Sequence, residues 1–316
     1  MSHPILLCDL SAGAYVKLAL AHTGHRPEHV KSYSCLTEAD FYNAIDDYLE
    51  AQGRTDLRGA AVASRGWEDN GVVHTPECNM TLTRDALRDR LSVKRLNLVN
   101  NFVARALAIP HLQGDEKDKL CGAESYDEQV IAVLGPHYGL GVAGLAPDGV
   151  GGWTAMPAEG GHSDLPATNE REWQVTAVLR QRHGYVAREF ALSMDGLVAV
   201  WQALVQLNGG AVAEATAQAV VDKTRAGDAL AKEAVALCTG WLAAMASDVG
   251  LIMGARGGIY LTGALIDLLG DDLFDRTAFC ERYADKGRLR QYISEIPVFR
   301  TRAPDLELIG LATLFD

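Results

Sequence analysis

The first third of the chain alternates short apolar runs with segments of helical spacing. Apolar runs that predict short buried strands lie at residues 4–10, 15–21, 58–64 and 95–100. Two segments place apolar residues at helical spacing: 38–53, which ends on Gly53, and 83–91, which opens on the capping residue Thr83. This alternation up to Pro110 predicts an open α/β sheet with crossover helices.

The remaining two thirds predict a second, larger α/β domain. A polar stretch at 115–128 predicts a break, and we place the domain boundary just before it. Strand patterns follow at 129–135, 139–147 and 151–161, and then helical patterns at 171–184, 193–207 and 227–254. A strand pattern at 257–265, a helical segment and a last strand pattern at 296–302 complete the domain. Two α/β lobes are the natural outcome, and pockets in such folds sit at strand ends.

Charge and cysteine content narrow the function classes. The 316-residue chain has a formal net charge of −12 and no basic patch, so nucleic acid is not an expected partner. Its six cysteines lack metal-ligand spacing, which predicts scattered buried thiols in a reducing cytoplasm and no metal site. The N-terminus lacks a signal-peptide pattern, and the apolar stretch 234–253 is interrupted by Ser247 and Asp248. We therefore predict a buried helix there and no membrane partner.

Four motifs, in their order and separations, carry a resemblance to a known family. They are "AIP" at 108–110, "GLGVA" at 139–143, "PAEGGHSD" at 157–164 and "YADKGRLRQYISEIPVF" at 283–299. With these motifs the chain resembles bacterial glucokinases, of the actin-like ATPase and sugar-kinase fold, nearly end to end. The resemblance implies a two-lobed α/β fold with an interlobe cleft. We predict a small lobe at 1–110, rejoined by a C-terminal helix at 303–316, and a large lobe at 111–302. It also implies a homodimer.

The hexose-binding residues of the family have counterparts in this chain. The resemblance assigns sugar contacts to Asn100, Asn101, Glu159, His162 and Glu189, with Asp164 close by. Carboxylates and amides suit this task because they bond several hydroxyls in fixed directions. A glutamate or histidine alone could equally satisfy a turn. Because all of these types stand in family register, the sequence favours a pocket for glucose or a related hexose.

The first phosphate loop departs from the family pattern. The family opens with Asp-x-Gly-Gly-Thr-Asn, a hairpin whose N–H groups and threonine hydroxyl hold ATP phosphates. Asp9 is retained, but the following residues are "SAGA", which include Ser11 and Gly13, and the flanks align only with one extra residue. An inserted residue changes the turn and re-aims its N–H groups.

The second phosphate loop and the nucleoside motif also differ. The family's Gly-x-Gly-Thr-Gly-Leu-Gly is "GPHYGLG" here, with His137, Tyr138 and Gly139 after a proline that has no N–H. Gly263 is followed by alanine where the family has a second glycine. In the first lobe, the family's Thr-Asn and tryptophan landmark reads "TPECNM" at 75–80, with Pro76 and Asn79 at the matching places. Each change alone is compatible with drift in a tolerant loop, but two altered loops favour weakened nucleotide binding.

Asn101 stands where the family has its catalytic aspartate. In the family that carboxylate takes the proton from the sugar 6-hydroxyl during attack on the γ-phosphate. An amide can hold a hydroxyl but cannot act as a base near neutral pH. General-base catalysis is worth roughly 10²–10⁴-fold, so the amide alone would leave a slow enzyme.

Three functions remain from these observations. The leading hypothesis is a catalytically dead or severely impaired glucokinase-family protein that binds a hexose and acts in sensing or regulation, with a protein partner left open and no tightly bound cofactor. The alternative is an active ATP-dependent glucokinase with unusual loops, which would need ATP and magnesium. A structural protein that binds neither ligand is the third. A DNA-binding repressor is disfavoured because no helix-turn-helix precedes the first strand.

Overall fold

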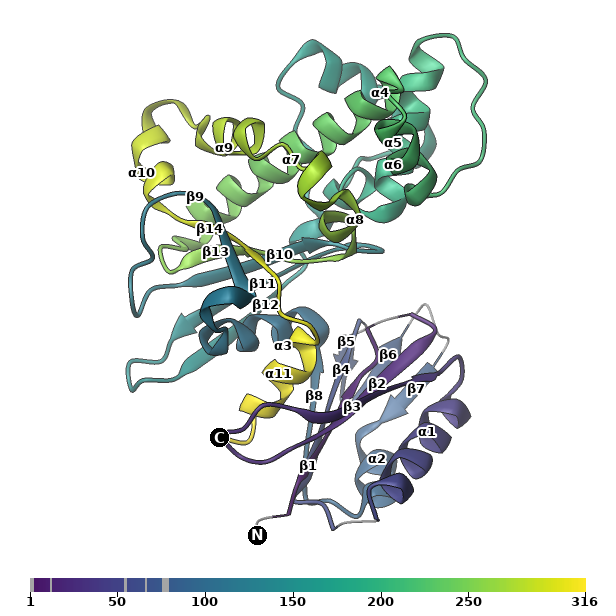
Figure 1. Ribbon diagram of the computed structural model, residues 1–316, viewed down its shortest axis with the longest axis vertical. Coiled ribbons are helices and arrows are strands. Elements are labelled where there is room, and N and C mark those ends of the chain that lie inside the picture. Colours follow the sequence, from purple (N-terminus) through teal and green to yellow (C-terminus); the bar gives the residue numbers. More distant parts are fainter. Residues whose placement is uncertain (1–2, 12, 54–55, 66, 76–79) are drawn as a thin grey trace. The chain divides into compact units, whose positions relative to one another are not determined.

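The structure is a computed structural model that describes residues 3–316 except 12, 54–55, 66 and 76–79. The predicted landmarks Pro76 and Asn79 lie outside the described residues. The chain divides into two compact units, Met1–Gly114 with Ala303–Asp316 as the first and Asp115–Arg302 as the second. Both units combine a sheet with helices, so the predicted α/β class is confirmed (Figure 1).

The first unit is built on a five-stranded sheet in the order β3-β2-β1-β4-β8. Its strands are β1 (Ile5–Asp9), β2 (Tyr15–Ala21), β3 (Glu28–Ser34), β4 (Gly59–Ser64) and β8 (Arg95–Asn100). Strands β1, β4 and β8 are parallel, whereas β2 and β3 extend the sheet antiparallel. A three-stranded sheet contains β5 (Trp67–Asp69), β6 (Val72–Thr75) and β7 (Met80–Thr83). The helices are α1 (Glu38–Ala51), α2 (Arg84–Leu91), α3 (Asn101–Ala108) and α11 (Leu306–Thr313), with 3-10 turns at Ile109–His111 and Gly114–Glu116.

Strand β1 is buried on both faces because helices cover both sides of its sheet. Leu6 and Cys8 belong to a core with α1 and α2, whereas Ile5 and Leu7 pack with α3 and α11. The two-residue period of a strand explains this division. Helix α11 approaches α3 closely, since a Cβ on Gly310 would lie 1.7 Å from the carbonyl oxygen of Ala104. The C-terminal segment is therefore an integral part of this unit.

Helix starts in the first unit follow local capping chemistry. Thr37 and Asp40 form a reciprocal capping box at the start of α1. The predicted capping role of Thr83 is confirmed, since its side chain accepts from the N–H of Ala86. Asn100 ends β8 and caps α3, so the strand-to-helix transition falls at the asparagine pair.

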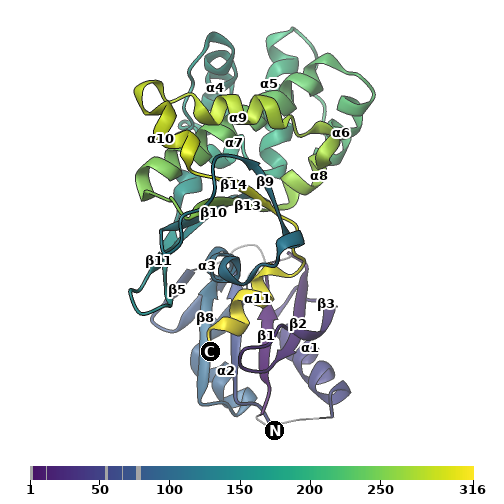
Figure 2. The same ribbon diagram turned by 60° about the vertical axis from the view of Figure 1, so that its left-hand side comes forward.

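The second unit contains a six-stranded sheet in the order β12-β11-β10-β13-β14-β9. Its strands are β9 (Lys117–Cys121), β10 (Ile131–Pro136), β11 (Leu140–Pro147), β12 (Trp153–Ala158), β13 (Gly258–Leu261) and β14 (Val298–Thr301). Its α-helices are α4 (Glu170–His183), α5 (Met194–Leu207), α6 (Ala217–Arg225), α7 (Ala229–Met253), α8 (Ala264–Leu273), α9 (Arg276–Ala284) and α10 (Arg290–Glu295). Short 3-10 turns are η3 (Gly160–His162), η4 (Arg188–Phe190) and η5 (Gly287–Leu289). Figure 2 shows these helices gathered on one side of the sheet.

Helix α7 is the central helix of the second unit's core. Among the described residues it is the one helix that is long and apolar enough to cross a membrane by length and composition. However, 67% of its most apolar window is buried inside the protein, and Trp241, Leu242 and Met245 lie in the main core cluster. This burial agrees with the prediction of a buried helix.

The sequence prediction was wrong about residues 117–121, which were assigned to a polar break. They form β9, which pairs antiparallel with β14 at the edge of the sheet. The strand was missed because an edge strand keeps polar side chains exposed: Leu120 is its one buried residue. Strand β3, which is polar and exposed for the same reason, was also not predicted.

Candidate functional site

In the first unit, the predicted residues lie at the carboxyl edge of the parallel strands. Asp9 pairs in register with Ala63, and the next residue along β4, Ser64, pairs with Asn100. The end of β1 and the end of β8 therefore flank the end of β4. Ligands of open α/β sheets bind at this edge, where loops and helix N-termini converge. Asn101 follows directly as the first residue of α3 and is only 5% exposed.

A buried polar network occupies the start of the β1–β2 turn. The N–H of Ser11 donates to Oδ1 of Asp9 at 2.8 Å, and its hydroxyl donates to Oε1 of Glu307 at 2.9 Å. The same Oε1 accepts from Nε of Arg105 at 2.6 Å. All four residues are at least 90% buried. The first turn is thus bonded to α11 through the Ser11 hydroxyl, and Glu307 in turn accepts from Arg105 of α3.

The electrostatics of this network shift the pKa values of its two carboxyl groups in opposite directions. Burial and then the charge of Glu307 raise the pKa of Asp9 to about 7, although bonds from Ser11 oppose this. Burial also acts on Glu307, but Arg105 holds the pKa of Glu307 below its ordinary value. Of the two carboxyl groups, Glu307 is therefore the one that carries the negative charge opposite the Arg105 guanidinium.

A second ion pair ties strand β2 to the C-terminal segment. Nζ of Lys17, on β2, donates to Oδ1 of Asp305 at 2.6 Å. Asp305 precedes α11 and has a φ of 54°, in the left-handed region. Gly13, in the turn itself, has a φ of 74°, which explains a glycine at this position.

In the second unit, the β10–β11 turn is closed by its own backbone. The N–H of His137 donates to the carbonyl of Gly139 at 2.7 Å, and the His137 carbonyl accepts from Met194 at 2.7 Å. The rings of His137 and Tyr138 lie 4.6 Å apart, and Tyr138 is 54% exposed. Pro136, which has no N–H, ends β10. Pro136 thus offers no backbone donor, and the N–H of His137 is used within the turn.

The segment predicted to be the nucleoside motif lies directly against this turn. A Cβ on Gly263 would lie 2.4 Å from the carbonyl oxygen of Pro136, and one on Gly135 would lie 1.8 Å from that of Thr262. Gly263 also has a φ of 121°, so glycine is required there. The structure thus brings the predicted segments 135–139 and 263–264 together at the ends of β10 and β13.

The predicted hexose residues of the second unit converge next to the same turn. Nδ1 of His162 lies 3.3 Å from Oε1 of Glu189. Segments 163–165 and 186–188 pair through backbone hydrogen bonds, with Asp164 opposite Ala187, and so hold η3 beside η4. Glu159 is the exposed residue that precedes η3.

Two glycines allow η3 and the β10–β11 turn to pack closely against their neighbours. A Cβ on Gly161 would lie 2.0 Å from the carbonyl oxygen of Leu140, and one on Gly139 would lie 3.1 Å from Oε2 of Glu189. The Glu189 carboxylate is therefore presented between the β10–β11 turn and His162. Two carboxylates and an imidazole on one short surface can accept and donate to several hydroxyls.

A charged cluster that the sequence analysis missed lies behind Glu189. Nη2 of Arg188 donates to Oδ2 of Asp248 at 2.8 Å, and Nζ of Lys286 donates to Oδ1 at 2.5 Å. Although burial raises it, these bonds from Lys286 and Arg188 lower the pKa of Asp248. The cluster joins η4 to α7 and to the "DKGR" segment, and it fixes the backbone next to Glu189.

Glu307 and Arg105 were also missed, although the sequence contains a signal for them. Each is a single charge in an otherwise apolar helical segment, "LELIGLA" and "FVARALA". Isolated opposite charges in two apolar helices indicate a buried pair. Among the described residues, no group of three or more histidine, cysteine, aspartate or glutamate side chains is placed to hold a metal ion.

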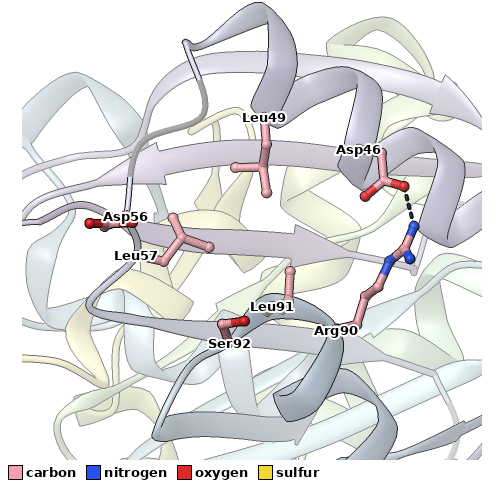
Figure 3. Close-up of a pocket in the computed structure, with 7 residues that line it drawn as sticks. All are labelled: Asp46, Leu49, Asp56, Leu57, Arg90, Leu91 and Ser92. Atoms are coloured by element: carbon pink, nitrogen blue, oxygen red, sulfur yellow. Dashed lines mark hydrogen bonds and ion pairs between the residues drawn. The ribbon is translucent and has the colours of Figure 1, made fainter.

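A separate cavity lies in the first unit between α1 and α2 (Figure 3). Its volume is about 630 Å³, and it is lined by Asp46, Leu49, Asp56, Leu57, Arg90, Leu91 and Ser92. Arg90 and Asp46 form an ion pair across it. None of the predicted site residues lines this cavity, so size alone does not identify the site.

Comparison with known proteins assigns the family. The sequence profile of the glucokinase family matches residues 8–316. The chain is 34% identical over 303 residues to a glucokinase-like protein of Caulobacter vibrioides, covering 96% of this chain and 94% of that protein. It is 32% identical over 318 residues to a glucokinase of Aromatoleum aromaticum, covering 100% and 95%. The protein belongs to the glucokinase family.

Solved structures show the same fold. A glucokinase from an Antarctic psychrotroph superposes with a TM-score of 0.89 at 24% identity, covering 100% of this chain and 99% of that one. A glucokinase from Balamuthia mandrillaris in complex with glucose superposes with a TM-score of 0.80 at 19% identity, covering 98% and 92%. The predicted sugar-kinase fold is confirmed.

Proposed function

We propose that this protein is a hexose-binding member of the glucokinase family whose phosphoryl-transfer activity is absent or severely impaired. The observation that carries the proposal is the double engagement of Ser11. Its N–H is bonded to Asp9 and its hydroxyl to Glu307, so neither donor is directed to a phosphate. Hexose recognition rests on a different set of residues, in the second unit.

Hexose binding is supported by Glu159, His162 and Glu189. Nδ1 of His162 lies 3.3 Å from Oε1 of Glu189, and the Arg188–Asp248 ion pair fixes the backbone next to Glu189. Such a preorganised set of acceptors and donors suits sugar hydroxyls. Family register assigns sugar contacts to Asn100 and Asn101 as well, and that assignment stays a prediction.

Tight binding of ATP and magnesium is not supported by the residues present. Backbone N–H groups that converge on an anion are the usual phosphate cradle. Here the Ser11 N–H is bonded to a carboxylate, the His137 N–H is bonded to Gly139, and Pro136 has none. These three positions offer no free backbone donor to a triphosphate, and we derive no catalytic step through it.

Asn101 supports the same conclusion for catalysis. Its amide starts α3 at the carboxyl edge of the sheet, 95% buried, in the position that family register gives to the catalytic base. An amide cannot take a proton near neutral pH. A missing base and two altered turns are independent losses, so we expect their effects to combine.

A binding experiment and a turnover experiment test the proposal together. Isothermal titration with glucose should give measurable heat, whereas titration with an ATP analogue and Mg²⁺ should give none at the same protein concentration. A coupled assay for ADP release should show no glucose-dependent turnover. Measurable glucose phosphorylation would support the alternative below, and absence of glucose binding would reject the sugar-binding claim.

The alternative is an active ATP-dependent glucokinase, and one observation favours it. Relatives named glucokinase match the chain over nearly its whole length at 31–33% identity. In that case Asp9 and the two turns would have to rearrange to admit ATP and magnesium. A homodimer, a protein partner and a cytoplasmic location are further predictions that rest on the resemblance and composition.

A further inference from the structure

Two cysteines from distant parts of the sequence meet at the edge of the second unit. Cys121 is the last residue of β9, and Cys280 lies on α9. Helix α9 is bonded to the end of β9: Nε of Arg276 donates to the Leu120 carbonyl at 2.7 Å. One turn later, Sγ of Cys280 lies 3.4 Å from the same carbonyl oxygen. These contacts place the Cys280 thiol beside residue 121.

The two thiols are close neighbours in the fold. Sγ of Cys280 lies against the carbonyl of Leu120, the residue that precedes Cys121, and both side chains pack against the same core cluster. Both are only partly buried, so a small reagent can reach them. The remaining described cysteines, Cys8, Cys35 and Cys238, are at most 2% exposed.

We propose that Cys121 and Cys280 form a redox-active dithiol that closes to a disulfide between β9 and α9 when the protein meets a small disulfide oxidant. The proposal is independent of the proposed hexose function, since neither cysteine belongs to the sites described above. It assigns a modification site to a surface that also includes the guanidinium of Arg276.

The reaction is an ordinary pair of thiol–disulfide exchanges. One protein thiol loses its proton to solvent and attacks a sulfur of the oxidant, which breaks the oxidant's S–S bond and releases one small thiol. The second protein thiol then attacks this mixed disulfide and releases the other small thiol. The two cysteines lose two electrons and two protons, and the oxidant is reduced to two thiols.

The surroundings set the rate of this exchange. Burial and then the neighbouring Cys280 raise the pKa of Cys121, whereas Arg276 opposes the shift. Since the thiolate is the nucleophile, exchange is slow at neutral pH and accelerates as the pH rises. This slow exchange distinguishes the dithiol from peroxide sensors, whose thiols react fast. The increase of the exchange rate with pH can be measured.

The disulfide would change the stability of the second unit. Strand β9 lies at the edge of the six-stranded sheet, where pairing on one side leaves a strand least restrained. A bond from Cys121 to Cys280 closes a long loop and restricts the unfolded chain. We expect the oxidised protein to melt about 5–10 °C higher than the reduced protein.

Glutathione disulfide at pH 8 provides the direct test on the full chain. The chain should carry Cys78→Ser, because Cys78 lies outside the described residues. Oxidation should lower the mass by two hydrogen atoms, and digestion should yield one peptide pair joined through Cys121 and Cys280. The rise in melting temperature should disappear with dithiothreitol. A linkage between any other cysteines, or only glutathione adducts, would overturn the proposal.

Matched variants separate the dithiol from single reactive thiols. Cys280→Ser should retain a glutathione adduct at Cys121 without the rise in melting temperature, whereas Cys238→Ser should respond like the parent. Phenylarsine oxide, whose arsenic bridges two thiols with release of water, should bind once per parent chain and not to the Cys280→Ser variant. This readout needs no disulfide geometry, so absence of arsenical binding to the parent would also reject the proposal.

Discussion

The hydroxyl of Ser11 donates a 2.9 Å hydrogen bond to the carboxylate of Glu307, and this bond joins the first turn of the chain to its last helix. The same carboxylate oxygen accepts from Arg105 at 2.6 Å. Ser11, which the resemblance places in a predicted phosphate turn, is thus part of the protein's internal structure. Its donors stabilise the first unit.

Removal of the Glu307 charge should destabilise the protein strongly. In Glu307→Gln, Arg105 would remain buried without its counter-charge, which typically costs about 3–5 kcal/mol. Urea unfolding at pH 7 measures this free energy. Glu28→Gln, an exposed change on β3, is the matched control and should stay within about 0.5 kcal/mol of wild type. Equal stability of the two variants would show that the buried pair contributes nothing.

Asp9 should make stability fall as the pH rises. Its pKa is raised to about 7 in the folded protein from an ordinary value of 3.8. Between pH 3.8 and pH 7, Asp9 is therefore protonated in the folded state but ionised in the unfolded state. The contribution of Asp9 to stability is fully present below pH 3.8 and is lost as the pH rises through 7. Glu307 has the opposite sign, since its pKa is lowered, but its stability share is lost only in more acidic solution.

Asp9→Asn isolates this effect. The amide oxygen can still accept from the Ser11 N–H, but it carries no charge at any pH. We expect the variant to gain stability relative to wild type between pH 5 and pH 8, by on the order of 1–4 kcal/mol. Urea unfolding of both proteins at the two pH values measures the difference. A difference independent of pH would mean that Asp9 titrates as an ordinary carboxyl.

The predicted hexose residues can be tested without catalysis. Glu159→Ala removes a carboxylate that we propose accepts from sugar hydroxyls, so glucose binding should weaken by at least about tenfold, as expected for the loss of charged hydrogen bonds. Isothermal titration measures the dissociation constant. Glu214→Ala, an exposed change elsewhere in the second unit, should leave the dissociation constant unchanged. If glucose binding weakened equally in both variants, the loss would come from a change in protein stability and not from a lost contact to the sugar.

Much of the fold was predictable because buried elements keep regular periods. The runs at β1, β4 and β8, and the capping residue Thr83, identified the first unit's sheet and helices. Strands β3 and β9 were missed because exposed edge strands keep polar side chains. Apolar periodicity arises from burial, and an exposed edge strand buries few side chains, so its sequence shows little periodicity.

For the candidate site, the sequence indicated residue types but not the bonds between them. The motif order indicated Glu159, His162 and Glu189, and the structure brings His162 and Glu189 within 3.3 Å. The Ser11–Glu307 bond could not be predicted, because its partners are 296 positions apart and depend on how α11 packs on α3. Long-range polar pairing follows from tertiary structure, and no local period encodes it.

The role of the asparagine pair can be separated from that of the turns by one substitution. Asn101→Asp introduces a carboxylate at the start of α3, where the resemblance predicts the catalytic base, but leaves the Ser11 and His137 donors engaged. We expect it to remain inactive with glucose and ATP. Recovery of turnover by this change alone would show that the turns still admit ATP and that only the base was missing.

The central claim is that the chain binds a hexose but does not transfer phosphate to it, and glucose-dependent ADP release by the unmodified protein tests this most directly. The assay should run at saturating glucose and ATP·Mg²⁺, with glucose binding verified on the same sample by titration. The account predicts binding heat and a turnover indistinguishable from the no-sugar control. Turnover on the order of 1–100 s⁻¹, as in ordinary kinases, would contradict it.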